Sequence, residues 1–131
     1  MTRATALLLS LIGLAACQGD ETISGYALSD AEWMLVDMGG TPFAARATIT
    51  FPQQGKIVGQ APCNRYVADQ TAPYPWFEAG PIGATKMACP DQAAEVDFFA
   101  GLMRVTLAEV SGDTLILSTE GGFEMLFRAL P

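Results

Sequence analysis

Turn-forming residues recur about every eight to twelve positions from Trp33 to the end of the chain, and this spacing limits the fold more than any other feature. Clusters of Gly, Pro, Asp and Asn separate short apolar or alternating runs, the pattern of an antiparallel β protein. In the run 47–51, apolar and threonine side chains alternate, with Ile49 and Phe51 on one face. The sequence predicts strands over 33–36, 47–51, 56–59, 105–110, 115–117 and 123–127, with less regular candidates over 74–78 and 82–87.

Only the segment 91–104 has the period of an α-helix. Pro90 suits the first turn, and Asp91 and Glu95 place negative charge near the positive end of the helix dipole. One broad apolar face, which we expect to pack as core against a sheet, contains Ala94, Phe98, Phe99, Leu102 and Met103. Glu95 projects into the middle of this face, where an unpartnered carboxylate would be strongly destabilising. We therefore expect backbone N–H groups, a hydroxyl or a cation to satisfy Glu95. The expected fold class is α+β, mostly antiparallel β.

The composition excludes several classes of function. Of the 131 residues, 50% are hydrophobic and 16% charged, which fits one packed domain and not a disordered chain. The net charge of -7 argues against a nucleic-acid partner, which would require a basic surface. The absence of His removes the commonest metal ligand and the commonest general base at neutral pH.

The sequence also lacks the common catalytic motifs. It contains no Gly-x-Ser-x-Gly elbow, phosphate-binding loop or dinucleotide fingerprint. Among the closely spaced carboxylates, Asp97 points away from Glu95 on the predicted helix, and Asp91 is explained by the helix dipole. We therefore expect no enzyme activity, no catalytic residues, no metal and no cofactor.

The first residues have the pattern of a bacterial lipoprotein signal. Arg3 precedes the uncharged run 6–14, which is well short of the ~20 residues that span a membrane. Leu-Ala-Ala-Cys at 14–17 resembles a lipobox, so we expect a signal peptide over 1–16 and an acylated Cys17. The alternative is an ordinary cleaved signal in which Cys17 has no role. Residues 17–30 are expected to comprise the lipidated cysteine and a polar, flexible tether.

These features predict a lipid-anchored protein of the bacterial cell envelope. Gln18 follows the cysteine where an Asp would favour retention in the inner membrane, so we expect the outer membrane with the domain facing the periplasm. The expected contact with the membrane is through the N-terminal lipid, and we expect a monomer.

With Cys17 acylated, Cys63 and Cys89 remain as an even pair in an oxidising compartment, which indicates a disulfide. Three alternatives stay open at this point. A metal site and a redox pair would both favour Cys-x-x-Cys spacing, which is absent. Cys89 also lies just before the predicted helix, which could make it a reactive thiol.

Two motifs follow one another around these cysteines. Cys-Asn-Arg-Tyr occupies 63–66 and Thr-Lys-Met-Ala-Cys occupies 85–89, with Glu95 and Phe98 shortly after. Together with the tryptophan run 33–36, these residues resemble the META/HslJ-like domain family. One departure is Ala68, where many members have Gly, and it concerns only the local turn.

The resemblance covers about residues 30–130, and we place the domain at 31–131. It implies an antiparallel sheet curved into a partial β-barrel around one helix. It also implies a recurring polar network at Asn64, Tyr66, Thr85 and Glu95, with either a structural role or a ligand-binding one. In the structural interpretation, the Tyr66 hydroxyl lies at the rim of the fold. Members are associated with heat-shock or envelope stress, with novobiocin tolerance, and in some cases with motility or secretion.

Tyr74, Trp76 and Phe77 form the densest aromatic cluster of the sequence. Their ordinary role is packing in the core or at its rim. If they are exposed beside Met87 or Met103, they could line a groove for an acyl chain or a peptide of a secretion component. The alternative function is therefore that of a carrier or pilot lipoprotein, with an envelope protein or a lipid as ligand.

Overall fold

Residues 19–131 are described by the structure, a computed structural model. The expected signal peptide at 1–16 and the expected lipidation site, Cys17, lie outside the described residues. The elements, in chain order, are η1 (Ile23–Gly25), β1 (Trp33–Met38), β2 (Thr41–Pro42), β3 (Thr48–Ile49), β4 (Lys56–Gln60), β5 (Arg65–Asp69), β6 (Gly83–Ala84), α1 (Gln92–Arg104), β7 (Leu107–Ser111), β8 (Thr114–Ser118) and β9 (Glu124–Ala129).

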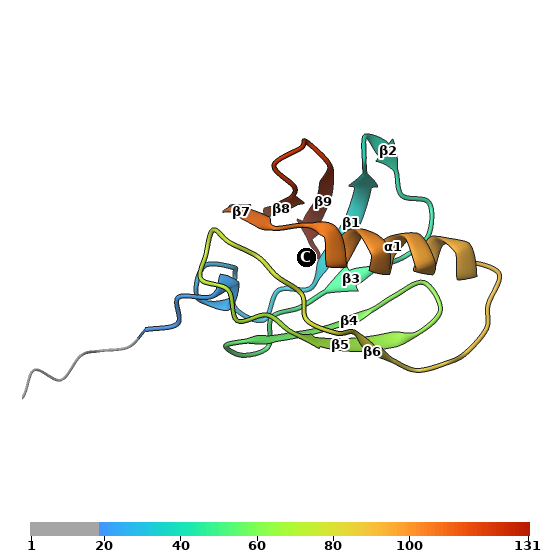
Figure 1. The fold of residues 1–131 in the computed structure, drawn as a ribbon, viewed down its shortest axis with the longest axis horizontal. Coiled ribbons are helices and arrows are strands. Elements are labelled where there is room, and N and C mark those ends of the chain that lie inside the picture. The colour runs from blue at the N-terminus through green and yellow to red at the C-terminus, as the bar shows by residue number, and fades with distance from the viewer. Residues whose placement is uncertain (1–18) are drawn as a thin grey trace, which may run out of the picture.

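The strands form two antiparallel sheets that follow one another around the domain (Figure 1). The first has the order β2-β1-β9-β8-β7, with β3 paired to the start of β1, and the second has the order β4-β5-β6. Thr50 and Val58 join them by a pair of backbone hydrogen bonds of 2.7 and 3.1 Å. Helix α1 lies across the open side of this curved arrangement, which is not a closed barrel. The predicted α+β class, with a curved antiparallel sheet packed on one helix, is confirmed.

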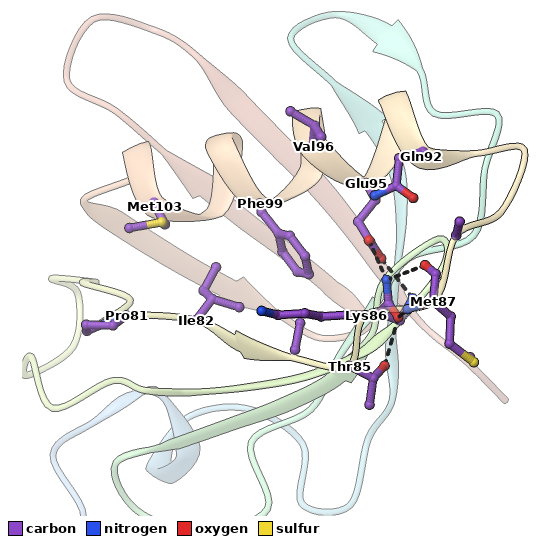
Figure 2. Close-up of a pocket in the computed structure, with 13 residues that line it drawn as sticks. Pro81, Ile82, Thr85, Lys86, Met87, Gln92, Glu95, Val96, Phe99 and Met103 are labelled. Atoms are coloured by element: carbon purple, nitrogen blue, oxygen red, sulfur yellow. Dashed lines mark hydrogen bonds between the residues drawn. The ribbon is translucent and has the colours of Figure 1, made fainter.

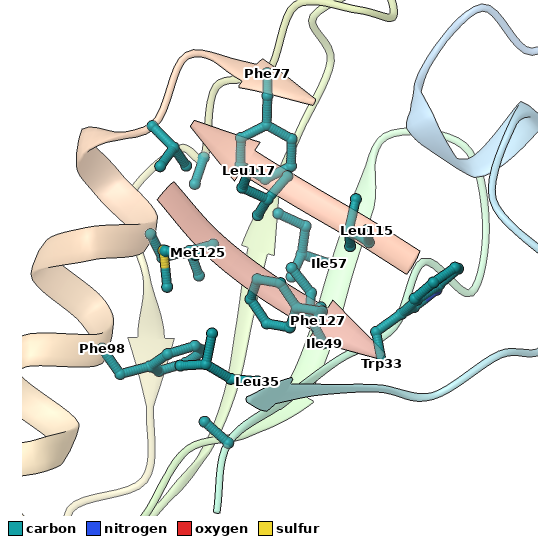
Figure 3. Packing of buried hydrophobic residues seen from close by; sticks show 14 of the residues in the cluster. Trp33, Leu35, Ile49, Ile57, Phe77, Phe98, Leu115, Leu117, Met125 and Phe127 are labelled. Atoms are coloured by element: carbon teal, nitrogen blue, oxygen red, sulfur yellow. The ribbon is translucent and has the colours of Figure 1, made fainter. Parts of the chain in front are cut away.

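The core lies between the concave face of the sheets and α1 (Figure 3). Strands β8 and β9 alternate regularly, so that every second side chain points inward. The helix contributes its own buried stripe to the same cluster. Completely buried large side chains are Trp33, Ile49, Ile57, Phe98, Leu102, Leu115, Leu117, Met125 and Phe127. Burial of each such side chain stabilises the fold by about 1.5–3 kcal/mol relative to exposure.

Two expected strands are reduced in the structure. The segment 74–78 forms only an isolated bridge between Trp76 and Leu107, because the prolines at 73 and 75 cannot donate to a ladder. In the segment 82–87, only Gly83–Ala84 pairs with a neighbouring strand.

Strand β5 was missed by the sequence prediction. It places Tyr66 and Ala68 in the core and leaves Arg65, Val67 and Asp69 exposed. The inward and outward side chains therefore alternate, but the hydropathy pattern does not show this, because the buried residue is a small Ala and an exposed one is Val.

The structure also differs from the expected tether. Residues 20–28 pack on the domain, with Ile23 in the core at 1% exposure. The Asp20 carboxylate accepts hydrogen bonds from the hydroxyls of Thr22 and Ser24, and the Tyr74 N–H donates to the Glu21 carbonyl at 2.7 Å. Because most of this segment is polar, its composition did not indicate that Ile23 would be buried.

Gly59 is required where β3, β4 and β5 meet. It lies opposite Tyr66, and a Cβ at this position would lie 2.7 Å from the Tyr66 ring and would collide with the Thr48 carbonyl. That carbonyl accepts the hydrogen bond of the Tyr66 hydroxyl at 2.8 Å, so neither group can move freely.

We therefore predict that Gly59→Ala lowers the free energy of unfolding by about 2–3 kcal/mol, measured by urea denaturation. Gly121→Ala is the matched control, because the nearest atom to its new Cβ is the Thr119 Oγ1 at 3.8 Å. This control should change stability by less than about 0.5 kcal/mol. Equal losses in the two variants would contradict the assigned packing.

Candidate functional site

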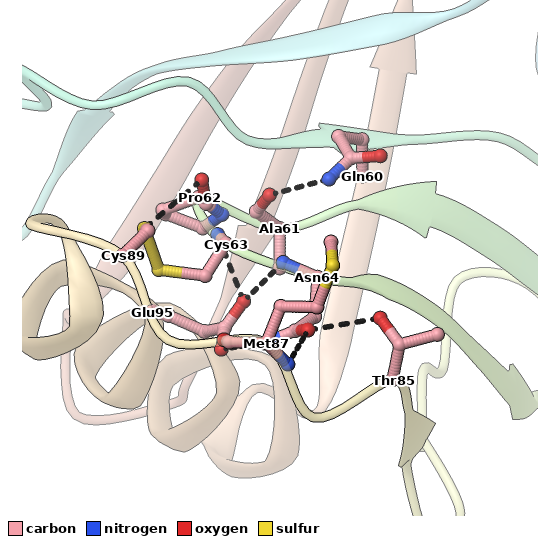
Figure 4. The surroundings of a disulfide bond; sticks show 9 residues. All are labelled: Gln60, Ala61, Pro62, Cys63, Asn64, Thr85, Met87, Cys89 and Glu95. Carbon is pink, nitrogen blue, oxygen red and sulfur yellow. Dashed lines mark hydrogen bonds between the residues drawn. A yellow bond between two sulfur atoms is a disulfide. The ribbon is translucent and has the colours of Figure 1, made fainter.

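The Glu95 carboxylate is the centre of a buried polar network that joins α1 to two loops, one just before β5 and one just before the helix (Figure 4). The side chain is only 4% exposed. Its Oε1 accepts the backbone N–H groups of Cys63 and Asn64 at 3.0 and 2.8 Å, and its Oε2 accepts the Asn64 side-chain Nδ2 at 2.7 Å. Three donors thus satisfy the carboxylate, as its place on the apolar face of the helix requires.

Asn64 extends this network to the segment before the helix. Its Nδ2 also donates to the Met87 carbonyl at 3.0 Å. Its Oδ1 accepts the Thr85 hydroxyl at 2.9 Å and the Met87 N–H at 2.6 Å. The Asn64 side-chain amide therefore uses all its hydrogen-bonding capacity: one N–H binds Glu95, and the other N–H and the oxygen hold residues 85–87 in place.

Cys63 and Cys89 are joined by a disulfide, with Cα atoms 5.6 Å apart. This bond links the residue before Asn64 to the residue before Pro90, so it connects the same two segments as the hydrogen bonds (Figure 4). Because both sulfur atoms are engaged, neither is a free thiol for metal binding or nucleophilic chemistry.

Tyr66 lies apart from the Glu95 network, which is a correction to the expected grouping. Its side chain is 1% exposed and not at the rim, and its hydroxyl donates to the Thr48 carbonyl. The ring makes edge contacts with Phe98 and Phe99 at centroid distances of 5.5 and 5.4 Å. Burial raises the pKa of the Tyr66 hydroxyl well above its usual range, so it stays protonated. Its alternation with Arg65 and Val67 on β5 directs it into the core.

The aromatic cluster does not line one groove, which corrects the second expectation. Phe77 is a core residue at 2% exposure. Tyr74 stacks on Tyr26 at 4.3 Å, and its hydroxyl accepts the Val110 N–H at 3.0 Å. Trp76 is 52% exposed. The irregular backbone at 74–78 separates side chains that a regular strand would have aligned.

A groove of about 680 Å³ lies elsewhere, between α1 and residues 81–88 (Figure 2). Phe99 and Ile82 line it, and in the view shown the Lys86 side chain runs below Phe99 and points towards Ile82. Its lining includes three well-exposed apolar side chains, Met87, Val96 and Met103. Their exposed fractions are 64%, 60% and 58%.

This groove was partly concealed in the sequence. Met103 belongs to the expected core face but is exposed. The signal that could have found the groove is a second apolar stripe, Val96, Phe99 and Met103, at helical spacing beside the core stripe.

The polar groups of the buried network are engaged within the fold. The polar groups of Glu95, Asn64 and Thr85 are occupied by one another and by the backbone. Among residues 19–131, no group of three His, Cys, Asp or Glu side chains is placed to hold a metal ion. The charged side chain in the groove that takes no part in this network is Lys86. The described part of the chain also contains no helix long and apolar enough to cross a membrane.

We predict that Glu95→Ala lowers the free energy of unfolding by about 3 kcal/mol or more, because the N–H groups of Cys63 and Asn64 become buried without an acceptor. Glu95→Gln keeps an oxygen for both N–H groups, but its NH2 group would face the NH2 group of Asn64, and two donors cannot bond. The free energy of unfolding should therefore fall by about 1–2 kcal/mol. Asp97→Ala, on the exposed side of the same helix, is the control and should be nearly neutral. Thermal and urea unfolding should rank the variants in this order, and a Glu95→Ala protein as stable as the control would refute the network's structural role.

Comparisons with known proteins agree with this architecture. No curated protein matches the sequence. A protein from Burkholderia xenovorans, solved by NMR, is similar in structure with a TM-score of 0.62 and 20% identity, over 99% of this chain and 95% of that one. A DUF4847 family protein from Bacteroides vulgatus, solved by crystallography, has a TM-score of 0.64 and 16% identity, over 81% and 96% of the two chains. At these identities the likeness concerns the fold alone. The model of the META domain family matches residues 26–130, and the chain therefore belongs to the META domain family.

Proposed function

We propose that this protein is a non-catalytic, lipid-anchored META-domain protein of the bacterial outer membrane that faces the periplasm and contributes to envelope stress or drug tolerance. The observation that carries the non-catalytic part is the saturation of the buried polar network. A general acid, base or nucleophile needs a side chain that can reach a substrate, and Glu95 has its oxygen atoms committed to three internal donors.

Two features support the location. The lipobox at 14–17 supplies the anchor, since acyl chains on Cys17 would hold the domain at a bilayer. The Cys63–Cys89 disulfide suits an oxidising compartment such as the periplasm. It encloses a loop that contains Asn64 and Thr85, so oxidation and the polar network stabilise the same part of the fold.

The test of this proposal is deletion of the gene followed by challenge with novobiocin and with heat. We predict lower survival of the deletion strain, restored by the full chain but not by the Cys17→Ser variant, which cannot be acylated. Membrane fractionation should place the restored protein, and not this variant, with the outer membrane. Survival equal to that of the parent strain under both challenges would contradict the stress role.

A second function, that of a carrier lipoprotein for an acyl chain or peptide, is favoured by the groove between α1 and residues 81–88. Its volume of about 680 Å³ lies within the usual range for small-molecule sites, about 300–1,000 Å³. Methionine side chains at positions 87 and 103 can adapt to ligands of different shape. The ammonium group of Lys86 offers a partner for a carboxylate or phosphate at the end of an apolar chain.

Palmitate is a suitable probe of this groove, detected as a bound mass in native mass spectrometry. We predict that Val96→Asp weakens palmitate binding at least about tenfold, because it places a carboxylate beside the apolar chain. Val67→Asp is the matched control, since Val67 is similarly exposed at 54% but lies outside this groove. Equal effects of the two substitutions, or no bound palmitate, would exclude the groove as an acyl-chain site.

A further inference from the structure

Large apolar side chains that are more than half exposed fall into two groups within the described residues. Met87, Val96 and Met103 line the groove already described. Tyr26, Leu28 and Trp76 lie outside the groove and form the second group, with Val67 apart from both. The second group contains the two exposed aromatic side chains of the set, at 53% for Tyr26 and 52% for Trp76.

The two segments that carry the second group, 20–28 and 73–77, lie at the end of the domain where the chain enters the fold (Figure 1). The segment 20–28 and the loop 73–77 are held together there. The Tyr74 N–H donates to the Glu21 carbonyl, and the Tyr74 ring stacks on Tyr26 at 4.3 Å. Trp76 pairs with Leu107 at the start of β7. We call the three exposed residues that these two segments carry, Tyr26, Leu28 and Trp76, the anchor-end patch.

The covalent chain limits how far this patch can be from a lipid attached at Cys17. Asp20 is fixed to Thr22 and Ser24, and Ile23 is buried in the core, so residue 20 is attached to the fold. Three residue steps separate Cys17 from Asp20, and a fully extended chain covers about 10 Å over that length. A diacylated Cys17 would therefore hold this end of the domain next to the lipid headgroups.

We propose that the anchor-end patch rests on the phospholipid surface, with Trp76, Tyr26 and Leu28 in the headgroup region of the bilayer. This inference rests on the lipidation included in the proposed function. Trp and Tyr prefer the membrane interface, where the ring is shielded and its polar atom remains hydrated. The net charge of -7 gives no attraction to anionic lipids, so the contact must come from the aromatic and apolar side chains and added salt should not weaken it.

The Asp20 carboxylate is engaged with its own chain. Burial by itself would raise the pKa of Asp20, but hydrogen bonds from Ser24 and Thr22 outweigh it and hold the pKa below its usual value. The ionised carboxylate is thus directed at its own chain. It fixes the 3-10 turn η1 that carries Ile23 inward and leaves Tyr26 outward.

The experiment uses the chain from residue 17 with its disulfide intact. Cys17 is then the one thiol free to couple to a maleimide phospholipid in vesicles of phosphatidylethanolamine and phosphatidylglycerol. Trp33 is completely buried, so acrylamide quenching of fluorescence reports mainly on Trp76. We predict that coupling lowers this quenching by about half or more, that brominated lipids quench the same signal, and that added salt weakens neither effect.

Trp76→Phe combined with Val67→Trp is the matched control, since it moves the exposed tryptophan to the outer face of β5. Its fluorescence should stay open to acrylamide after coupling. Unchanged quenching of Trp76, or equal shielding at position 67, would overturn the proposed orientation. Because the anchor is attached chemically, either result is independent of lipidation in the cell, which the mass of the natural protein at Cys17 tests separately.

Discussion

The structure depends on the way that Glu95 is satisfied. A carboxylate in the middle of the buried face of α1 would oppose packing of the helix on the sheet unless the opposing segment supplied hydrogen-bond donors for it. The turn at Cys63 and Asn64 supplies those donors from consecutive backbone N–H groups, and the Asn64 amide adds a third. The helix can therefore pack in one position along the sheet, because a shift by one turn would leave both the carboxylate and the turn unpaired.

That constraint also forms the groove. Asn64 and the disulfide hold residues 85–89 at a fixed distance from the start of α1, and the side chains of this segment are left exposed. The opposite wall comes from the helix face next to the Glu95 stripe, with Phe99 between them in contact with Tyr66. A rigid polar network thus supports a surface of flexible, apolar side chains. Such a surface fits the carrier function that we propose as the alternative, with Lys86 as the charged contact for the ligand.

The sequence predicted well those parts of the fold that local periodicity determines. Strands at 115–117 and 123–127, the helix at 91–104 and the anomaly of Glu95 could all be found, because each contrasts with its neighbours in hydropathy. Strand β5 could not, since Ala68 points inward and Val67 outward. The prediction that the aromatic cluster lines one groove failed for a related reason. Alternating residues share a face only in a regular strand, and the prolines at 73 and 75 prevent a regular strand at 74–78. The packing of residues 20–28 combines one large buried apolar side chain, Ile23, with contacts to Tyr74, and composition averaged over a polar segment reveals neither.

The two exposed apolar groups of this domain differ in chemistry, and the difference follows their positions. The groove presents methionine and valine, which offer adaptable apolar contact and no hydrogen bond of their own to hydrated headgroups. The anchor-end patch presents Tyr26 and Trp76, whose polar atoms suit a boundary between water and lipid. If the second group rests on the bilayer, with Asp20 only three residue steps from the cysteine that we propose to be acylated, the domain has one orientation with respect to the membrane. The lipid then does more than restrain diffusion, because it fixes the direction in which the groove of an otherwise small and acidic domain meets the periplasm.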